Sequence, residues 1–388
     1  MPRPGRRPAE ALLSELRERG ILVVCGSGGV GKTTVAAALG LHAALSGRRV
    51  LVCTIDPSRR LATSLGLEKL SGKPRQLDLG RFGPALEGSL HAMVLDTKRT
   101  FDEIVTRYAE NESARRRILS NRLYKQVSAA LVGSHEYMAM EKLLELSEDD
   151  RFDLVVLDTP PTRHALDFLE APDRLMSFLD TSILRFFLKP YFVAGRLTLS
   201  VATRTGALAL KLADRFLGLQ FLQDLSEFFL AFGGMYDGFK ERAARVHGLL
   251  RDPCSGFLLV AGPSSAALDE ALFFHRRLDE EKMPFLGFVV NRVHPDPASA
   301  AGGSGAGPRA RVDDETAERL LDCYREQRTL FRAERKTIGR IEVDTGERPL
   351  LVPELDQDVH DLRGLREVGD LLFSEALPAR RERGRASS

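Results

Sequence analysis

Residues 26–34 hold the densest set of groups able to do chemistry in this 388-residue chain, reading Gly-Ser-Gly-Gly-Val-Gly-Lys-Thr-Thr. They fit the pattern G-x-x-x-x-G-K-[ST], whose glycines let successive backbone N–H groups turn inward around phosphate oxygens. Lys32 would neutralise the β- and γ-phosphates of a nucleotide, Thr33 would bind Mg²⁺, and Thr34 would reach the α-phosphate. The segment predicts a nucleotide site made of Gly26, Ser27, Gly28, Gly29, Val30, Gly31, Lys32, Thr33 and Thr34.

Two carboxylates follow apolar segments elsewhere in the chain. Asp56 comes after residues 49–55, and Asp158 closes the run 152–158. A carboxylate at the carboxyl end of a parallel strand faces the crevice where ligands bind in open α/β sheets. Asp158 would hold Mg²⁺ through water, because Mg²⁺ keeps several waters and takes few carboxylates. Asp56 also fits a simple Asp-Pro turn or helix cap, and this alternative stays open.

The segments around these residues alternate between apolar strands and helices. Residues 21–25, 33–45 and 49–55 form a strand, a helix and a second strand, which is a βαβ unit. Further strands are expected at residues 89–96, 152–158, 257–261, 285–291, 341–343 and 350–352, with helices at 11–19, 266–282, 317–336 and 359–373. This order predicts an α/β P-loop fold, with a mostly parallel sheet flanked by helices.

Long helical stretches interrupt the alternating pattern and indicate an inserted α-helical subdomain. They span residues 98–148 and 170–250. The nucleotide-binding core would then comprise residues 11–97, 149–169 and 251–376. A flexible Ala/Gly/Ser-rich loop is expected at 297–312, and disordered tails are expected at 1–10 and 377–388, the second one basic.

Composition excludes several classes of protein. Hydrophobic residues make up 43% and charged residues 28%, which excludes a wholly disordered chain. The formal net charge of +2 gives no reason to expect a nucleic-acid partner. No apolar run follows the basic N-terminus as in a secretory signal, and the most apolar stretch, 184–210, contains Lys189, Arg196 and Arg204. We therefore expect a cytoplasmic protein.

The phosphate loop also resembles a particular superfamily. Gly-Ser-Gly-Gly-Val-Gly-Lys-Thr is similar to the deviant Walker A motif G-K-G-G-V-G-K-T of the ParA, MinD, nitrogenase iron protein and ArsA proteins. In that motif the first lysine reaches across a dimer interface to the nucleotide of the partner, and here Ser27 takes its place. A paralogous subunit could supply the missing cation, or Arg59, Arg60 or Arg163 of this chain could replace it.

Two further segments narrow the resemblance to the ArsA/Get branch. Residues 54–58, Thr-Ile-Asp-Pro-Ser, resemble switch I of these ATPases, which implies that Asp56 orients and deprotonates the attacking water. Residues 158–166 resemble switch II, D-T-A-P-T-G-H-x-L, which implies switch roles for Asp158, Pro160, Thr162 and His164.

The adenine side of the site is implied by two more matches. Residues 289–292, Val-Val-Asn-Arg, resemble a family segment whose asparagine amide reads adenine, which implies this role for Asn291. The alternative is that Asn291 simply starts a loop. Residues 352–355, Val-Pro-Glu-Leu, resemble the adenine loop, in which Pro353 would cover the base.

The resemblance implies an ATPase that couples binding and hydrolysis of Mg-ATP, with ATP and Mg²⁺ as cofactors, to dimer closure and the handling of a client. The protein would be a homodimer or a heterodimer with a paralogue. The apolar stretch 170–250 suits a groove for a hydrophobic helix or membrane protein, but also an ordinary helical core.

The cysteines at positions 25, 53, 254 and 323 form no C-x-x-C pair. We therefore expect no zinc clasp and no arsenite site. Two alternatives remain, namely a hydrolysis-poor subunit of a heterodimer and a MinD-like ATPase that binds membranes through residues 362–373.

Overall fold

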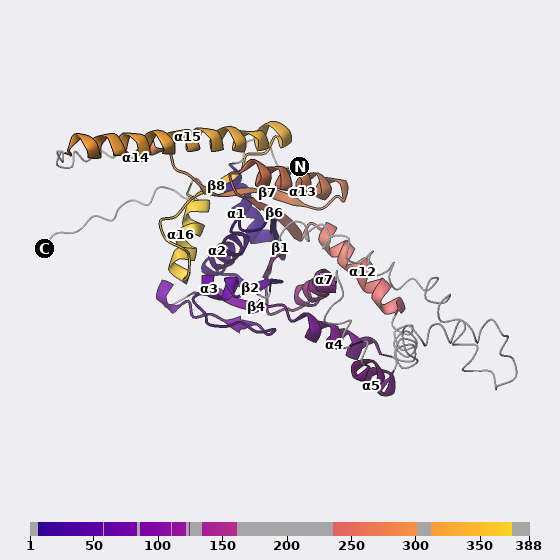
Figure 1. The fold of residues 1–388 in the computed structure, drawn as a ribbon. Coiled ribbons are helices and arrows are strands. Elements are labelled where there is room, and N and C mark those ends of the chain that lie inside the picture. The colour runs from indigo at the N-terminus through magenta and orange to yellow at the C-terminus, as the bar shows by residue number, and fades with distance from the viewer. Residues whose placement is uncertain are drawn as a thin grey trace, which may run out of the picture. The chain divides into compact units, whose positions relative to one another are not determined.

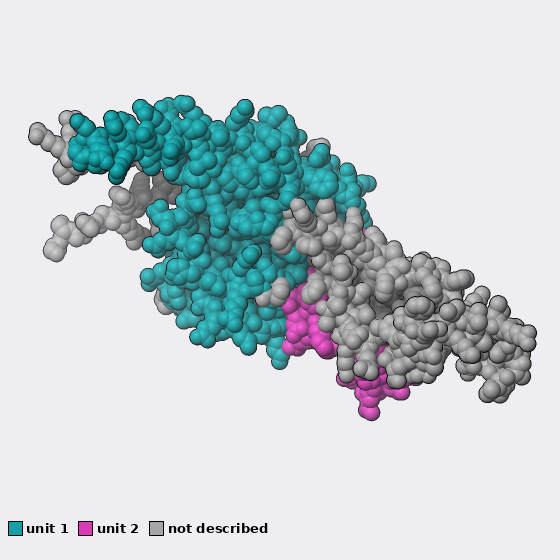
Figure 2. Space-filling model, viewed as in Figure 1, with its two compact units in different colours: residues 1–94, 146–165, 250–388 teal, residues 95–145, 166–249 magenta. Residues whose placement is uncertain are grey.

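The fold is seen in a computed structural model that describes residues 7–56, 58–83, 86–109, 111–121, 124, 134–160, 236–300 and 312–374. These residues divide into two compact units. Unit 1 comprises residues 1–94, 146–165 and 250–388, and unit 2 comprises residues 95–145 and 166–249; Figure 2 colours them separately.

Unit 1 is built on an eight-stranded sheet with the order β3-β4-β2-β5-β1-β6-β7-β8 (Figure 1). Only the edge strand β3 pairs antiparallel, with β4, and every other pair in the described sheet is parallel. The predicted α/β fold with a mostly parallel sheet is therefore confirmed. The strands are β1 (Ile21–Gly26), β2 (Arg49–Thr54), β3 (Arg75–Gln76), β4 (Ser89–Val94), β5 (Leu154–Asp158), β6 (Ser255–Ala261), β7 (Phe285–Val293) and β8 (Leu350–Pro353).

The centre of the sheet explains why the sequence has such continuous apolar runs. Every residue of β1, β5 and β6 is buried. Strands of a parallel sheet are covered on both faces, so they lack the alternation of a half-exposed strand. Their carboxyl ends therefore meet at one edge of a rigid core, where Gly26 and Asp158 end β1 and β5.

Helices of unit 1 pack on this sheet and on one another. The most extensive helix pairing joins α2 and α16, where Phe373 lies against the ring of His42 at a centroid distance of 4.4 Å. The helices are α1 (Pro8–Glu18), α2 (Lys32–Leu45), α3 (Arg60–Ser64), the 3₁₀ turn η1 (Gly80–Phe82), α13 (Ser265–Glu280), α14 (Pro297–Ala300), α15 (Asp314–Thr345) and α16 (Leu362–Leu372). The helix α12 (Tyr236–Arg251) joins the two units in sequence.

Three sequence-based predictions about local structure need correction. Residues 8–10, predicted as part of a disordered tail, form the start of α1, where Pro8 occupies a helix N-terminus that needs no N–H. Residues 341–343, predicted as a strand, continue α15, because the helix stops only where Gly346 adopts a left-handed φ of 76°. Residues 297–300 of the predicted loop form α14, and residues 301–311 lie outside the described residues.

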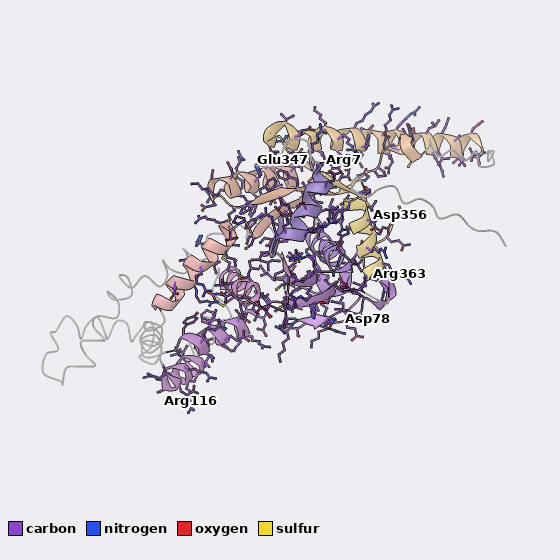
Figure 3. All side chains as sticks on the ribbon, turned by 180° about the vertical axis from the view of Figure 1, so that it is seen from behind. Arg7, Asp78, Arg116, Glu347, Asp356 and Arg363 are labelled. Atoms are coloured by element: carbon purple, nitrogen blue, oxygen red, sulfur yellow. The ribbon has the colours of Figure 1, made fainter. Side chains whose placement is uncertain are left out.

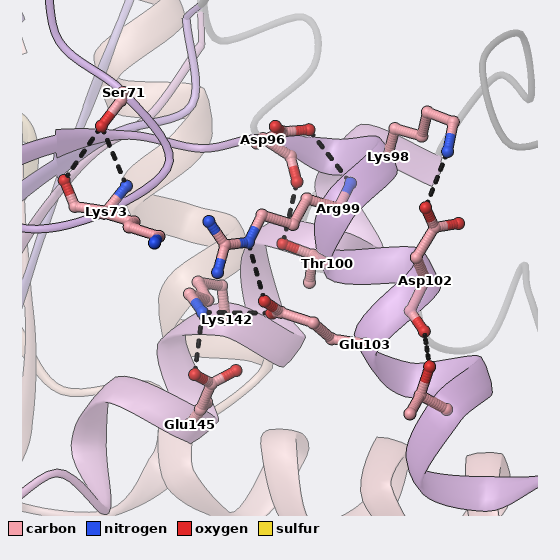
Figure 4. A network of polar contacts seen from close by, with 11 residues as sticks. Ser71, Lys73, Asp96, Lys98, Arg99, Thr100, Asp102, Glu103, Lys142 and Glu145 are labelled. Carbon is pink, nitrogen blue, oxygen red and sulfur yellow. Dashed lines mark hydrogen bonds and ion pairs between the residues drawn. The ribbon is translucent and has the colours of Figure 1, made fainter.

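Unit 2 is helical where it is described. It contains α4 (Thr97–Tyr108), α5 (Glu112–Ser120), and most of α7 (Ser134–Ser147) and α12. Asp96 caps α4 by accepting a hydrogen bond from the Arg99 amide at 3.0 Å (Figure 4). Lys142 of α7 then pairs with Glu145 at 2.8 Å and with Glu103 of α4 at 3.5 Å, which ties the two helices together.

The groove for a hydrophobic client was predicted at residues 170–250, and residues 170–235 of it lie outside the described residues. Within the part of the chain that the structure describes, no helix is both long and apolar enough to span a membrane.

Unit 2 contains a buried ion pair between Arg242 of α12 and Glu141 of α7. The Arg242 guanidinium also donates a hydrogen bond to the Tyr108 hydroxyl at 3.0 Å.

Two helical glycines test how tightly α2 packs on the sheet. A Cβ on Gly40 would lie 2.5 Å from the Cγ2 atom of buried Val52, whereas a Cβ on Gly339 in α15 would meet nothing within 4 Å. We expect Gly40→Ala to lower the free energy of unfolding by about 1–3 kcal/mol through overpacking. The matched change Gly339→Ala should raise it by about 0.5–1 kcal/mol through helix propensity. Denaturant unfolding of both variants measures this, and equal stabilisation by both would contradict the packing of α2 on β2.

Candidate nucleotide site

The loop between β1 and α2 has a backbone that only glycine allows at its two ends. Gly31 precedes α2 with a left-handed φ of 88°, and a Cβ there would lie 2.2 Å from the Nδ2 atom of Asn291. A Cβ on Gly26 would lie 1.9 Å from the carbonyl oxygen of Val260 in β6. The loop is therefore clamped between the sheet and a side chain of β7, and its amides precede the positive end of α2.

Lys32 opens α2 and is only 7% exposed. Its ammonium donates a hydrogen bond to the carbonyl oxygen of Ser27 at 2.8 Å. Burial lowers the pKa of Lys32, and the nearby carboxylate of Asp158 opposes that shift. The side chain thus lies folded over its own loop, with its charge next to the loop backbone.

Asp158 ends β5 and is 1% exposed. Its Oδ2 atom accepts hydrogen bonds from the hydroxyls of Thr33 at 2.7 Å and Thr54 at 2.9 Å. Its Oδ1 atom is buried and accepts no hydrogen bond from a described residue. Burial raises the pKa of Asp158 to about 6, although the two threonine hydroxyls and Lys32 lower it. A buried carboxylate oxygen without a partner beside a threonine hydroxyl is a donor set that suits Mg²⁺.

Asp56 follows β2 in a turn. Its Oδ1 atom accepts a hydrogen bond from the Ser58 amide at 2.8 Å, so the turn that the sequence allows is present. Its Oδ2 atom lies 3.9 Å from the Nη1 atom of Arg60. The Asp56 amide donates to the Thr54 hydroxyl at 3.2 Å, and that hydroxyl donates to Asp158. Thr54 therefore connects the backbone of Asp56 with the carboxylate of Asp158.

Asn291 of β7 contacts the phosphate loop directly. Its Nδ2 atom donates to the carbonyl oxygen of Val30 at 2.8 Å, and the side chain is buried. The pairing of β7 with β8 is irregular just beyond it, where Arg292 adopts a left-handed φ of 59°. Sequence reasoning assigned Asn291 to the adenine and did not foresee this bond.

A cavity of about 740 Å³ opens beside the loop, within the size range of small-molecule sites. One wall carries loop and α2 residues, the second carries α3, and the third runs from β7 and β8 toward α16. Asp356 and Arg363, labelled in Figure 3, mark the connection from β8 to α16. The predicted site residues that line the cavity are Gly29, Gly31, Lys32, Thr33, Thr34, Asn291 and Pro353.

Several predicted residues do not line this cavity. Asp56 and Asp158 instead contact residues of the lining, namely Arg60 and Thr33 respectively. Pro160 follows β5 and is partly exposed, while Thr162 and His164 lie outside the described residues. Thr54 was not predicted as a site residue. Its hydroxyl, at the end of an apolar strand and two residues before Asp56, could have indicated it.

The model of the family described as anion-transporting ATPase (ArsA ATPase) matches residues 19–329. The ATPase GET3C of Arabidopsis thaliana is 27% identical over 371 residues, which cover 92% of this chain and 83% of that protein. The ATPase GET3B of the same plant is 23% identical over 366 residues, covering 90% and 77%.

A third relative matches over a shorter stretch. A putative arsenical pump-driving ATPase of Halobacterium salinarum is 33% identical over 182 residues, which cover 44% of this chain and 27% of that protein. The family model matches well over half of the chain and includes the phosphate loop, Asp56, Asp158 and Asn291. The chain therefore belongs to the anion-transporting ATPase (ArsA/Get3) family and is an ATP hydrolase.

Proposed function

We propose that the cavity beside residues 26–34 is the ATP site and that Lys32, Asp56 and Asp158 carry out the hydrolysis. The observation that carries this assignment is the Asp158 carboxylate. It is buried beside Lys32, bonded to the Thr33 hydroxyl, and has one oxygen without a described partner. A buried carboxylate oxygen without a hydrogen-bond partner does not stabilise a fold, whereas in a nucleotide site it can bind a ligand.

ATP would replace contacts that the loop now makes with itself. The Lys32 ammonium would leave the Ser27 carbonyl and bind the β- and γ-phosphates, while loop amides and the start of α2 receive the phosphate oxygens. The base would lie toward Asn291 and Pro353, which border the same cavity.

The oxygen donors fit Mg²⁺. The Thr33 hydroxyl would hold it directly, and Asp158 would hold it through water, using the Oδ1 atom that has no described partner. When bound, Mg²⁺ neutralises charge on the β- and γ-phosphate oxygens.

Asp56 would orient the attacking water. Its Oδ1 atom is fixed by the Ser58 amide, which leaves Oδ2 to accept a proton from water. The water oxygen then forms a bond to the γ-phosphorus and the bond between that phosphorus and the ADP oxygen breaks, giving ADP and phosphate. Pro160, Thr162 and His164 would follow the loss of the γ-phosphate as a switch, as their resemblance to switch II implies.

The site needs a second cation, because Ser27 offers none. Arg59 and Arg60 both line the cavity, and Arg60 lies 3.9 Å from Asp56. We assign the cation role to Arg60, since a guanidinium near the attacking water can stabilise charge on the γ-phosphate. Ser27 equally favours the second candidate function, a hydrolysis-poor subunit whose missing lysine comes from a paralogue.

Binding of ATP would close a dimer, either of two copies or with a paralogue, and would control a client held by the helical segments. The apolar composition of residues 170–250 supports a hydrophobic helix or a membrane protein as that client. The alternative of membrane binding through residues 362–373 has no support, because Leu362, Leu365 and Val368 are buried in the core that includes α2.

The assignment of Lys32 and Asp56 predicts two separable defects. Lys32→Ala should weaken binding of fluorescent ATP at least about tenfold and abolish turnover, because it removes the charge beside the phosphates. Asp56→Asn should retain binding but lower turnover about 10²–10⁴-fold, because only the proton acceptor is lost. Phosphate release and fluorescence anisotropy measure the two effects. The control is Lys336→Ala, which removes an exposed lysine outside the cavity. Unchanged turnover in both site variants would exclude this site.

The assignment of Arg60 makes a prediction that separates a self-sufficient ATPase from a subunit that needs a paralogue. Arg60→Ala should lower turnover by about 10–10³-fold without loss of ATP binding, and Ser27→Lys in the same chain should restore part of it. Arg59→Ala is the matched neighbour and should have a smaller effect. If wild-type turnover is absent and Ser27→Lys alone creates it, the cation normally comes from another subunit.

The bond from Asn291 to Val30 predicts how base selectivity responds to mutation. Asn291→Ala should weaken binding of ATP and GTP by similar factors, about 5–30-fold, because the loss of one buried hydrogen bond loosens the phosphate loop. Competition binding with both nucleotides measures this ratio. A loss confined to ATP would show instead that the amide reads adenine.

A further inference from the structure

The helix α15 has two halves with different surroundings. Its C-terminal half buries Glu334, Ile338 and Ile341 and contacts α13 and β7. Its N-terminal half, residues 314–333, has no buried side chain. The short helix α14 also packs against α15. A long helical segment of unit 1 therefore has no buried side chain over residues 314–333.

The apolar stripe that anchors the C-terminal half continues into the exposed half. Ala317, Tyr324 and Phe331 precede Ile338 at intervals of seven residues, which is two helical turns. Leu320 and Leu321 lie between the first two and are 58% and 53% exposed. The seven-residue repeat is the spacing with which one helix packs along another. We call this set the α15 stripe, namely Ala317, Leu320, Leu321, Tyr324 and Phe331.

Charge is distributed unevenly along the same segment. Residues 312–318 contain four carboxylates and no basic side chain, namely Asp313, Asp314, Glu315 and Glu318. Residues 328–336 contain Arg328, Arg332, Arg335 and Lys336, and their one carboxylate, Glu334, is buried. The helix itself pairs only part of this charge, as Glu315 does with Arg319 at 2.8 Å. A second α15 lying antiparallel would place each acidic end against a basic end, whereas a parallel one would place like charges together.

We propose that the exposed half of α15 binds the same segment of a second copy of this chain, in antiparallel orientation and centred on Tyr324. In this register Ala317 of one copy faces Phe331 of the other, so that a small side chain meets a large one, and Tyr324 faces Tyr324. The contact is isologous, and residues 313–336 give it a length of about 36 Å. It does not involve the nucleotide cavity, so it is separate from a dimer that ATP closes.

Sedimentation velocity of the full-length chain without nucleotide tests the proposal, with protein from low to high micromolar concentration. The acidic-end variant carries Asp314→Lys, Glu315→Lys and Glu318→Lys, and the basic-end variant carries Arg328→Glu, Arg332→Glu and Arg335→Glu. Each variant alone should dimerise at least about tenfold more weakly than the wild type, because both of its charge contacts become repulsive. An equimolar mixture should restore the dimer, because the reversed ends attract one another.

Two controls separate this contact from others. Glu10→Lys, Glu68→Lys and Glu367→Lys make the same change of charge on exposed residues outside α15 and should leave the dimer intact. Lys32→Ala should also leave it intact, because the contact needs no nucleotide. Failure of the ATP assignment and failure of this proposal are therefore distinguishable.

The register has its own test. Cys323 is exposed and adjacent to the centre at Tyr324, so mild oxidation should give a covalent dimer. Cys323→Ser should abolish this covalent dimer, whereas Cys254→Ser should retain it.

Three results would overturn the proposal: a wild-type chain that stays monomeric without nucleotide, a dimer that neither reversal weakens, or a mixture that does not restore the dimer. The last result would indicate that a different protein, or another segment of this chain, covers the stripe.

Discussion

The buried carboxylate of Asp158 is the constraint on which the site depends. A carboxylate in the interior of a parallel sheet costs several kcal/mol unless other groups stabilise it. Hydroxyls from α2 and β2 provide part of that stabilisation, and burial still raises the pKa of Asp158 to about 6. The three elements are thereby fixed around one oxygen atom, and the other oxygen is left for a ligand. Thr54 extends the same connection to Asp56, so that the residues assigned to metal and to water share one hydrogen-bonded chain.

The sequence alone was sufficient for the features that follow from short-range rules. The glycines of residues 26–31 and the apolar runs of β1 and β5 predict a parallel sheet with a phosphate loop, because few other structures tolerate them. Features that depend on partners distant in the sequence were not predictable in this way. The bond from Asn291 to Val30 joins residues 261 positions apart and forms only once β7 lies beside the phosphate loop in the folded chain.

Two elements of the fold differ from what the sequence predicts, each for its own physical reason. Residues 341–343 contain two β-branched side chains and were predicted as a strand, but the helix that reaches them from Asp314 continues because no residue stops it before Gly346. Ile341 is then buried where α15 packs on the core, so tertiary packing outweighs strand propensity. The two-residue edge strand β3 was missed because Arg75 and Gln76 are exposed and carry no apolar pattern.

The strand β7 connects the nucleotide site with α15. Asn291 near its end holds the phosphate loop, and His294 just beyond it donates its amide to Glu334 of α15 at 2.9 Å. The His294 ring lies 2.7 Å from Glu334 and 3.3 Å from Glu354, which borders the cavity. The buried half of α15 is therefore fixed by the same segment that positions the loop. Because that anchoring uses none of the α15 stripe, the exposed half can bind a second molecule without any of these contacts being broken.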